Sequence, residues 1–222
     1  MLYLYNAQAG EASLLLEGDD HRYIFKVRRH KVDDTLYLRN LEDGLLHQYI
    51  ITHLDKRTVH LTLQESIALE IKASKSLHIG WCIIDTKSVE KVLPSLNEMG
   101  VEKITFIYCE RSQKSFKLDF KRLKKILLNS SQQSGRSEMV SLEMGDSLES
   151  FIKENPNTKM LNFSKNNFVS STVFDTIVIG CEGGFSDEEV GLFEAVDIVG
   201  FDTPLVLKSE TAAVAVVSKV LL

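Results

Sequence analysis

A glycine-rich segment with two nearby carboxylates lies in the last quarter of the 222-residue chain. The apolar run Ile177–Ile179 predicts a buried strand, and Ser186 with Glu189 forms the capping box that begins a helix. Between them, residues 180–184 read Gly-Cys-Glu-Gly-Gly, so a ligand could approach the main chain closely. Open α/β sheets bind ligands at loops that leave the carboxyl ends of parallel strands. A plain tight turn is the alternative interpretation.

A second segment, near the C-terminal end, repeats this design. Residues 205–207 predict a short strand, and residues 210–222 predict a helix that is capped by Ser209 or Thr211. Two loops of this kind could face one ligand. We therefore expect residues 180–184 and 205–212 to meet in space.

The three cysteines are Cys82, Cys109 and Cys181. Because they are odd in number and widely spaced, we expect neither a disulfide framework nor a zinc site, and a reducing cytoplasm fits. All six histidines lie at or before His78, so no histidine neighbours Cys181 in sequence to activate it as a nucleophile.

The elements that must position these residues fall into two parts. Residues 1–70 hold short apolar or alternating segments separated by turn residues, which predicts a small β-barrel. Its predicted strands are 2–5, 13–16, 35–39, 44–54 and 57–63. Residues 72–222 alternate between strand and helix patterns, which predicts a mainly parallel sheet covered on both faces. Its predicted strands are 77–84, 103–108, 159–163, 175–179, 197–201 and 205–207, and its predicted helices are 87–99, 118–131, 146–153, 186–195 and 210–222.

Composition is that of a globular protein, with 44% hydrophobic and 26% charged residues. No apolar run approaches the ~20 residues that span a bilayer. The net charge of −5 argues against a nucleic-acid partner, but it hides two basic groups. One has Tyr23 and Phe25 interleaved and contains Arg22, Lys26, Arg28, Arg29 and Lys31. The other contains Arg111, Lys114, Lys117, Lys121, Arg122, Lys124 and Lys125. Such groups suit phosphate contacts and base stacking, and a solvated helix face is the alternative.

Six motifs, in order, carry a resemblance to a known family. They are Val27-Arg-Arg29, Asn97-Glu-Met-Gly-Val101, Glu110-Arg-Ser112, Gln132-Gln-Ser-Gly-Arg136, Gly180-Cys-Glu-Gly-Gly-Phe-Ser186 and Leu207-Lys-Ser-Glu-Thr-Ala212. The chain resembles the ribosomal RNA uracil-N3-methyltransferases of the small subunit, which belong to the SPOUT class of S-adenosylmethionine-dependent enzymes. The resemblance implies a PUA-like RNA-binding barrel over residues 1–70 and a SPOUT α/β domain with a trefoil knot over residues 72–222. It also implies a cytoplasmic homodimer that acts on small-subunit ribosomal RNA or on the assembled small subunit, with no membrane partner.

The resemblance implies a set of site residues without any metal ligand. Those expected at the cofactor are Leu161, Asn162, Gly180, Cys181, Glu182, Gly183, Gly184, Leu205, Val206, Leu207, Lys208, Ser209, Glu210, Thr211 and Ala212. Those expected at RNA are Arg22, Lys26, Arg28, Arg29, Lys31, Arg111, Ser112, Lys114, Gln133 and Arg136. The catalytic candidates are Glu182, Glu210 and Arg29.

Each catalytic candidate has an alternative role. Glu182 could cap a loop amide, Glu210 could sit in the favourable first turn of a helix, and Arg29 could form a surface salt bridge. Cys181 stands where the family usually has proline, and Lys208 where it has arginine. These departures, with Ser95 in place of the family's usual lysine, lend some weight to an alternative function, a non-catalytic RNA-binding ribosome assembly factor, which cofactor binding would distinguish from an enzyme.

Overall fold

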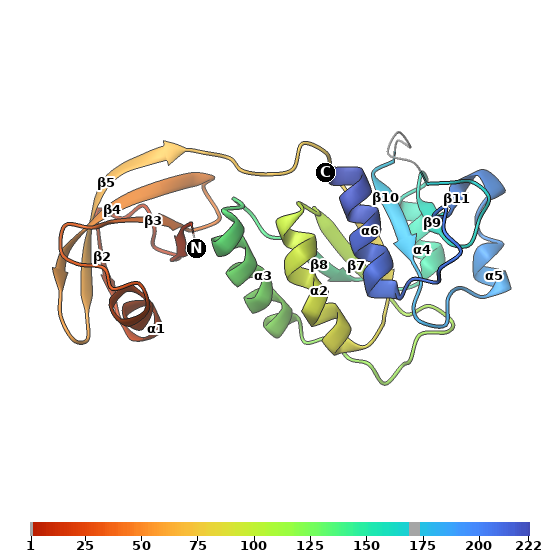
Figure 1. The fold of residues 1–222 in the computed structure, drawn as a ribbon, viewed down its shortest axis with the longest axis horizontal. Coiled ribbons are helices and arrows are strands. Elements are labelled where there is room, and N and C mark those ends of the chain that lie inside the picture. Colours follow the sequence, from red (N-terminus) through yellow and green to blue (C-terminus); the bar gives the residue numbers. More distant parts are fainter. Residues whose placement is uncertain (1, 169–173) are drawn as a thin grey trace. The chain divides into compact units, whose positions relative to one another are not determined.

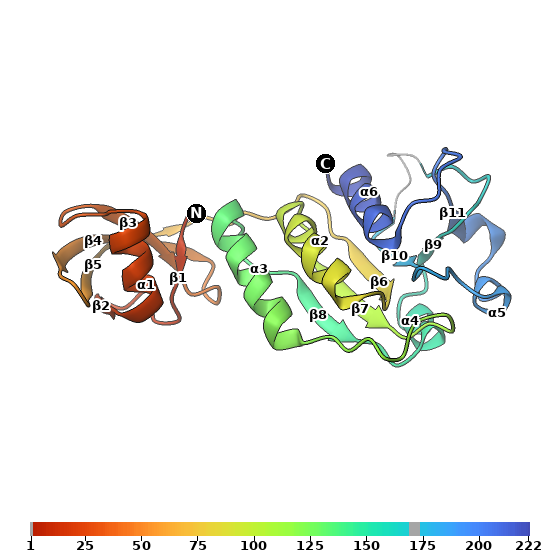
Figure 2. The same cartoon turned by 60° about the horizontal axis from the view of Figure 1, so that its bottom comes forward.

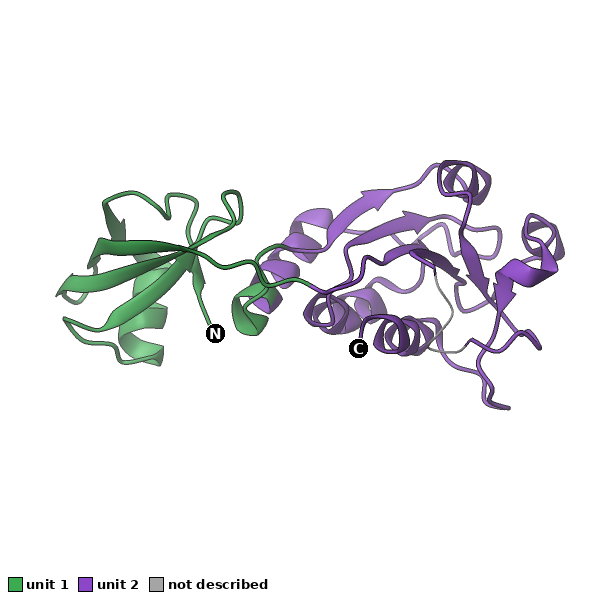
Figure 3. Cartoon of the chain, turned by 90° about the horizontal axis from the view of Figure 1, so that it is seen from above, with its two compact units in different colours: residues 1–72, 131–138 green, residues 73–130, 139–222 purple. Residues whose placement is uncertain are grey.

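The computed structural model describes residues 2–168 and 174–222 and divides the chain into two compact units (Figure 3). Unit 1 comprises residues 1–72 together with residues 131–138, and unit 2 comprises residues 73–130 and 139–222. Residues 131–138 join unit 1 through main-chain hydrogen bonds, such as that from Leu2 N–H to the carbonyl oxygen of Gln132, 2.8 Å long. Met1 and residues 169–173, which the predicted domains include, lie outside the described residues.

Unit 1 is built on a five-stranded sheet in the order β1-β3-β4-β5-β2 (Figure 1). The strands are β1 (Leu4–Tyr5), β2 (Ser13–Leu16), β3 (Thr35–Arg39), β4 (Leu45–Leu54) and β5 (Val59–Ala68). Only β1 runs parallel to its neighbour. Since β1 and β2 do not pair in the described residues, the predicted barrel is open between them.

The predicted strands of unit 1 are found, with β5 ending five residues later than expected. It continues to Ala68 because pairing with β4 resumes after a register shift between Gln48 and Tyr49. The basic segment, residues 22–31, begins at the end of helix α1 (Gly18–Arg22), continues through a π-helical turn η1 (Tyr23–Val27) and ends in the loop that follows. The buried side chain of Ile24 anchors that turn in the core of unit 1.

Unit 2 contains a six-stranded, wholly parallel sheet in the order β11-β9-β10-β6-β7-β8. The strands are β6 (His78–Cys82), β7 (Lys103–Ile107), β8 (Ser141–Met144), β9 (Lys159–Leu161), β10 (Thr176–Ile179) and β11 (Ile198–Val199). The central strands β6 and β10 are almost wholly buried, as a parallel sheet covered on both faces requires.

Helices cover both faces of this sheet (Figure 3). They are α2 (Thr86–Glu98), α3 (Phe120–Ser134), α4 (Leu148–Glu154), α5 (Asp187–Val190), a 3₁₀ turn η2 (Ala195–Asp197) and α6 (Ser209–Leu221). Helices α2 and α6 lie side by side in both ribbon views (Figures 1 and 2). On the other face, the ring of Phe151 from α4 lies where a β-carbon on Gly80 would be, so Gly80 allows α4 to approach. No helix of the described chain has the length and apolar character to cross a bilayer.

Two predicted elements of unit 2 were wrong, and one strand was missed. Residues 205–207 form no strand, because Leu205 and Val206 are 71% and 77% exposed and pair with no strand in the described chain. The helix predicted over residues 186–195 ends after one turn, at Gly191. Strand β8 was missed because it lies at the sheet edge, half-exposed, and carries no continuous apolar run.

The spacing of the cysteines argued against disulfides, and this prediction was also wrong, since Cys82 and Cys109 form one. In the parallel pairing of β6 with β7, Cys82 lies opposite Ile107. Cys109 follows two residues later, which leaves the two α-carbons 5.5 Å apart, within the range that a disulfide needs. Wide spacing in sequence did not exclude this pair because neighbouring strands of a parallel sheet are joined by a long crossover.

The buried hydroxyl of Tyr3 makes the stability of unit 1 depend on pH in the alkaline range. Its hydroxyl donates a hydrogen bond of 2.8 Å to the carbonyl oxygen of Arg136, and its ring lies 5.5 Å from the guanidinium of Arg39. Burial raises the pKa of Tyr3 to about 12, against the opposing charges of both arginines. The unfolded chain therefore loses this proton first, from about pH 10, and the folded protein only near pH 12.

Below pH 10, ionisation of Tyr3 should not change the free energy of unfolding. Between pH 10 and pH 12 this free energy is expected to fall, by roughly 2–3 kcal/mol at pH 12. Urea unfolding at a series of alkaline pH values measures the fall. Tyr3→Phe is expected to start less stable, because it loses the hydrogen bond, but to lose less stability over this range. Equal slopes for both proteins would contradict the role of Tyr3.

Candidate active site

The glycine loop, residues 180–184, leaves the carboxyl edge of the unit 2 sheet. Strand β10 ends at Ile179, which pairs with Trp81 of β6 on one side and with Leu161 of β9 on the other. Gly184 has a φ of 68°, a left-handed conformation that favours glycine, and its N–H donates to the carbonyl oxygen of Cys181, 2.9 Å away. Local backbone geometry therefore explains a glycine at position 184.

The predicted capping box at the start of α5 is confirmed. The Ser186 hydroxyl accepts a hydrogen bond from the N–H of Glu189, and the Glu189 carboxylate accepts one from the N–H of Ser186. The other oxygen of Glu189 accepts the N–H of Glu110, 2.8 Å away, in the loop that follows β7. One buried carboxylate thus fixes the end of the glycine loop to a neighbouring loop of the sheet.

The expectation that residues 180–184 and 205–212 meet is confirmed through Ser209. Its hydroxyl donates to the carbonyl oxygen of Gly180, 2.5 Å away, and accepts the indole N–H of Trp81, 2.9 Å away. Ser209 is buried and is the first residue of α6, whose N-cap is Lys208. The prediction that Ser209 or Thr211 caps this helix was therefore wrong, because the Ser209 side chain is bonded to the glycine loop instead.

Ser209→Ala is expected to loosen this contact. The change leaves the Trp81 N–H and the Gly180 carbonyl without this partner, and a buried polar group in that state costs about 1–3 kcal/mol. We expect a lower melting temperature and weaker ligand binding at the glycine loop. Ser209→Thr, which keeps a hydroxyl, is the control and should retain more of both; an alanine variant as stable as wild type would contradict the bridge. Calorimetry measures both quantities.

Arg111 closes the other side of the glycine loop. Its Nη1 donates to the carbonyl oxygen of Gly183, 3.0 Å away, and a β-carbon on Gly183 would lie 3.0 Å from the Arg111 β-carbon. Gly183 itself is exposed. A side chain at position 183 would press on Arg111, so this close approach favours glycine there. The hydrogen bond from Arg111 holds the Gly183 peptide against the loop after β7.

The two candidate carboxylates lie on the joined segments. Glu182 is exposed, and its Oε1 accepts the N–H of Asp85, the N-cap of α2, at 3.3 Å. This contact is the amide-capping role that the sequence left open. Glu210 is half-buried in the first turn of α6, next to Ser209.

The remaining cofactor candidates line the same edge. Leu161 and Asn162 are half-buried at the end of β9, and the Asn162 N–H donates to the carbonyl of Val199. Before α6, Leu205 and Val206 expose most of their apolar surface. Residues 161–162, 180–184 and 205–212 therefore belong to loops or helix starts at the carboxyl edge of one sheet, of which 180–184 and 209 are in direct contact.

The candidate RNA-binding residues fall on both units. On unit 1, the candidates with exposed side chains are Arg22, Lys26, Arg28, Arg29, Lys31 and Gln133. On unit 2, Arg111 and Lys114 are exposed. Two candidates are not surface residues: Ser112 is buried, with its hydroxyl accepting the Cys109 N–H, and Arg136 is 4% exposed and paired with Glu138 at 3.0 Å. Both side chains are buried and bonded within the protein, so they support the fold and are not exposed for contact with RNA.

Among residues 2–168 and 174–222, none is placed to activate Cys181 as a nucleophile. Its thiol is buried, and its Sγ lies 3.6 Å from the carbonyl oxygen of Gly184. His78, the histidine of unit 2, lies at the amino end of β6, where burial lowers its pKa. The described residues contain no cluster of side chains that could hold a metal ion.

Sequence reasoning missed two residues that shape this site. Trp81 donates its indole N–H to Ser209, and Glu110 presents its main-chain N–H to Glu189. The single tryptophan, in a strand predicted to be buried, was an available indication, since a buried indole N–H needs an acceptor. No pattern in the sequence pointed to the main-chain contact of Glu110.

Comparisons with known proteins agree with this geometry. A family model described as an RNA methyltransferase domain matches residues 72–221, and one described as an RNA methyltransferase PUA domain matches residues 16–64. Ribosomal RNA small subunit methyltransferase E of Helicobacter pylori is 36% identical over 222 residues, covering 98% of each chain.

Solved structures share the fold over nearly the whole chain. A putative methyltransferase of Legionella pneumophila, in complex with the bound cofactor S-adenosylmethionine, is 26% identical with a TM-score of 0.77, covering 98% of this chain and 95% of that one. A probable rRNA-methyltransferase of Porphyromonas gingivalis is 21% identical with a TM-score of 0.80, covering 99% and 95%. The family model over most of unit 2 and the full-length relative confirm the resemblance, and the chain belongs to the ribosomal RNA small subunit methyltransferase E family.

Proposed function

We propose that this protein transfers a methyl group from S-adenosylmethionine to N3 of one uridine in small-subunit ribosomal RNA. The observation that carries the proposal is the junction at the carboxyl edge of the unit 2 sheet, where Ser209 joins the glycine loop to the start of α6. Family membership supplies the reaction class, and the H. pylori relative's name supplies the substrate class.

The residues at this edge suit the cofactor. Gly183 and Gly184 carry no β-carbon that would cover their main-chain groups, and Leu205 and Val206 expose apolar surface that an adenine could cover. We assign the adenosine and methionine portions to residues 180–184 and 205–212, with residues 161–162 beside them. The bound cofactor supplies an electrophilic methyl group on a sulfonium.

The chemistry left to the protein is alignment and proton removal. The neutral imide nitrogen of uracil is a poor nucleophile, so a base must accept its proton as the carbon–nitrogen bond forms. Glu210 and Glu182 are the carboxylates at the site. Glu182 is already engaged with the Asp85 amide, which favours Glu210 as the acceptor. Arg111, exposed beside Gly183, is placed to stabilise negative charge on a uracil oxygen.

The family implies finer features that we also propose. The unit 2 chain threads a trefoil knot of the SPOUT type, and two copies form a homodimer in the cytoplasm, where the ribosomal substrate is made. The contact of the α6 start with the glycine loop supports the knot. Unit 1 binds RNA through its basic segment, in which Arg29 is the catalytic candidate that lies outside unit 2.

Mass spectrometry of small-subunit ribosomal RNA tests this function. Cells lacking the protein are expected to lose a single methyl mark on one uridine, and the wild-type gene is expected to restore it. The Glu210→Gln gene should fail to restore the mark while its product still binds S-adenosylmethionine. A protein that binds RNA but ignores S-adenosylmethionine, with an unchanged methylation pattern in the deletion strain, would instead identify a non-catalytic assembly factor.

A further inference from the structure

Unit 1 contains a pocket of about 340 Å³ that lies apart from the glycine loop in sequence and belongs wholly to unit 1. Its wall is formed by residues from β1 and its approach, from η1 and from the first half of β3. The lining residues that matter here are Tyr23, Arg28, His30, Thr35, Leu36 and Tyr37. A volume of this size is at the small end of the range of ligand pockets, which is about 300–1,000 Å³.

The pocket exists because β1 is too short to cover β3. Strand β1 pairs only with Leu38 and Arg39, so residues 35–37 have no partner strand on that side in the described chain. An uncovered strand edge presents main-chain N–H and carbonyl groups in a row. The pocket therefore offers hydrogen-bonding groups of both kinds along one wall.

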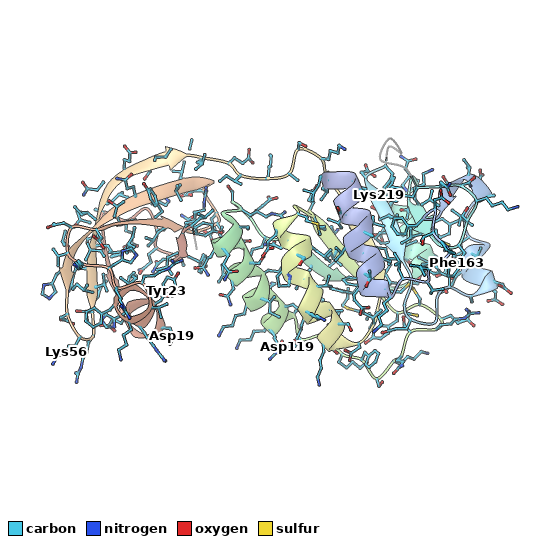
Figure 4. All side chains as sticks on the ribbon, viewed as in Figure 1. Asp19, Tyr23, Lys56, Asp119, Phe163 and Lys219 are labelled. Carbon is cyan, nitrogen blue, oxygen red and sulfur yellow. A yellow bond between two sulfur atoms is a disulfide. The ribbon has the colours of Figure 1, made fainter. Side chains whose placement is uncertain are left out.

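Two tyrosine rings flank these groups. Tyr23 is half-buried, and its hydroxyl accepts a hydrogen bond of 2.5 Å from Nε of Arg28, whose guanidinium carbon lies 5.5 Å from the ring centroid. This arrangement keeps the Tyr23 ring in place beside a cation. Figure 4 labels Tyr23, which directly follows helix α1. Tyr37 is 39% exposed, so part of its ring is free to contact a ligand.

The surroundings of the pocket are cationic. Arg28 lines it directly, and Lys26, Arg29 and Lys31 are exposed on the same short segment of chain. Aromatic faces, hydrogen-bonding groups and cations together match the three parts of a nucleotide: the base plane, the base edge and the phosphate.

We propose that this pocket holds one unpaired nucleotide of the RNA substrate, with its base against Tyr37 and Tyr23 and its phosphate on Arg28. The inference rests on the proposed RNA substrate but concerns a second contact, outside the glycine loop. A paired base would leave the pocket empty, because its edge and faces are already covered within the duplex. The pocket thus selects RNA that presents a single-stranded nucleotide.

Binding of two fluorescent probes to the full-length protein tests this inference. One probe is a short oligouridylate, and the other is a ribose-phosphate oligomer of equal length without bases. We expect wild type to prefer the oligouridylate, and Tyr37→Ala to weaken its binding by about 5- to 100-fold while barely changing binding of the abasic oligomer. Tyr37→Phe keeps the ring and should bind like wild type.

Further variants separate stacking from charge. Arg28→Ala should weaken both probes and reduce the salt dependence of oligouridylate binding by about one phosphate contact. Thr35→Trp fills the pocket from an exposed position and should act like Tyr37→Ala. Leu15→Ala, on the exposed face of β2 at the other end of the strand order, is the matched control and should bind like wild type.

The outcomes distinguish this inference from the proposed function. If Tyr37→Ala and Thr35→Trp bind both probes as wild type does, the pocket does not take a base, whatever the enzyme methylates. If wild type neither binds S-adenosylmethionine nor methylates RNA, the proposed reaction is wrong, while the preference for oligouridylate still reports on the pocket.

Discussion

Gly183→Val is expected to weaken binding of S-adenosylmethionine on the order of 100-fold, because a side chain at this position meets Arg111. The added β-carbon would lie 3.0 Å from the Arg111 β-carbon, and the two branching methyl groups need further space. To make room, either the glycine loop or the loop after β7 must move. A shift of the glycine loop changes the main-chain groups that we assign to the cofactor, and a shift of the loop after β7 loses the hydrogen bond that fixes Gly183. Isothermal titration calorimetry measures the loss.

The matched control for this variant is Glu188→Val. It introduces the same side chain at an exposed position of α5, a few residues further along the chain. We expect Glu188→Val to bind the cofactor like wild type, and both variants to keep the circular dichroism spectrum of the folded protein. Wild-type affinity in Gly183→Val would remove the glycine loop from the cofactor site.

The sequence predicted the elements well where the pattern was strong. Strand β10 is a run of apolar residues and α2 has an apolar face, and both lie within one or two residues of their predicted bounds. The capping box of Ser186 and Glu189 is a local motif, so it could be recognised without knowledge of the fold. Short-range physics of this kind is readable from the order of residues alone.

The contacts that assemble the site depend on tertiary structure. Ser209 looked like a helix cap, because serine before a helix usually plays that role. In the folded chain its hydroxyl is used by Gly180 and Trp81, residues that the sheet topology brings close and the sequence keeps apart. Leu205 and Val206 had the pattern of a buried strand, yet they are exposed. A short run of apolar residues is therefore found both in buried strands and in an exposed loop whose side chains could cover an apolar ligand.

Two arginines of the family motifs, Arg136 and Arg111, have contacts that the motifs did not predict. The motif that ends in Arg136 supports the family, but burial and the pairing with Glu138 show that this arginine works inside unit 1. Arg111, which the sequence offered as an RNA contact, also fixes Gly183. A motif identifies which positions matter, and only the contacts say what each side chain does.

Removal of the Cys82–Cys109 disulfide is expected to lower the free energy of unfolding by about 3.5 kcal/mol under oxidising conditions. The estimate follows from the chain entropy that a cross-link removes from the unfolded state when the two residues are 27 apart. Urea unfolding of Cys82→Ser and of wild type measures the difference. Cytoplasmic reductants normally keep such pairs as thiols, so wild type is also unfolded with a reductant, where it should approach the variant.

Cys181→Ser is the matched control for this experiment, since Cys181 is also buried but carries a free thiol. The reductant should lower the free energy of unfolding of Cys181→Ser by the same amount as that of wild type. If wild type and Cys82→Ser unfold alike under oxidising conditions, the cross-link does not form in solution. If the cross-link does form, its position gives it a functional consequence: Cys109 precedes the Arg111 loop that grips Gly183, so reduction should also loosen cofactor binding. Titration of S-adenosylmethionine with and without reductant would measure that coupling, and Cys82→Ser should show none.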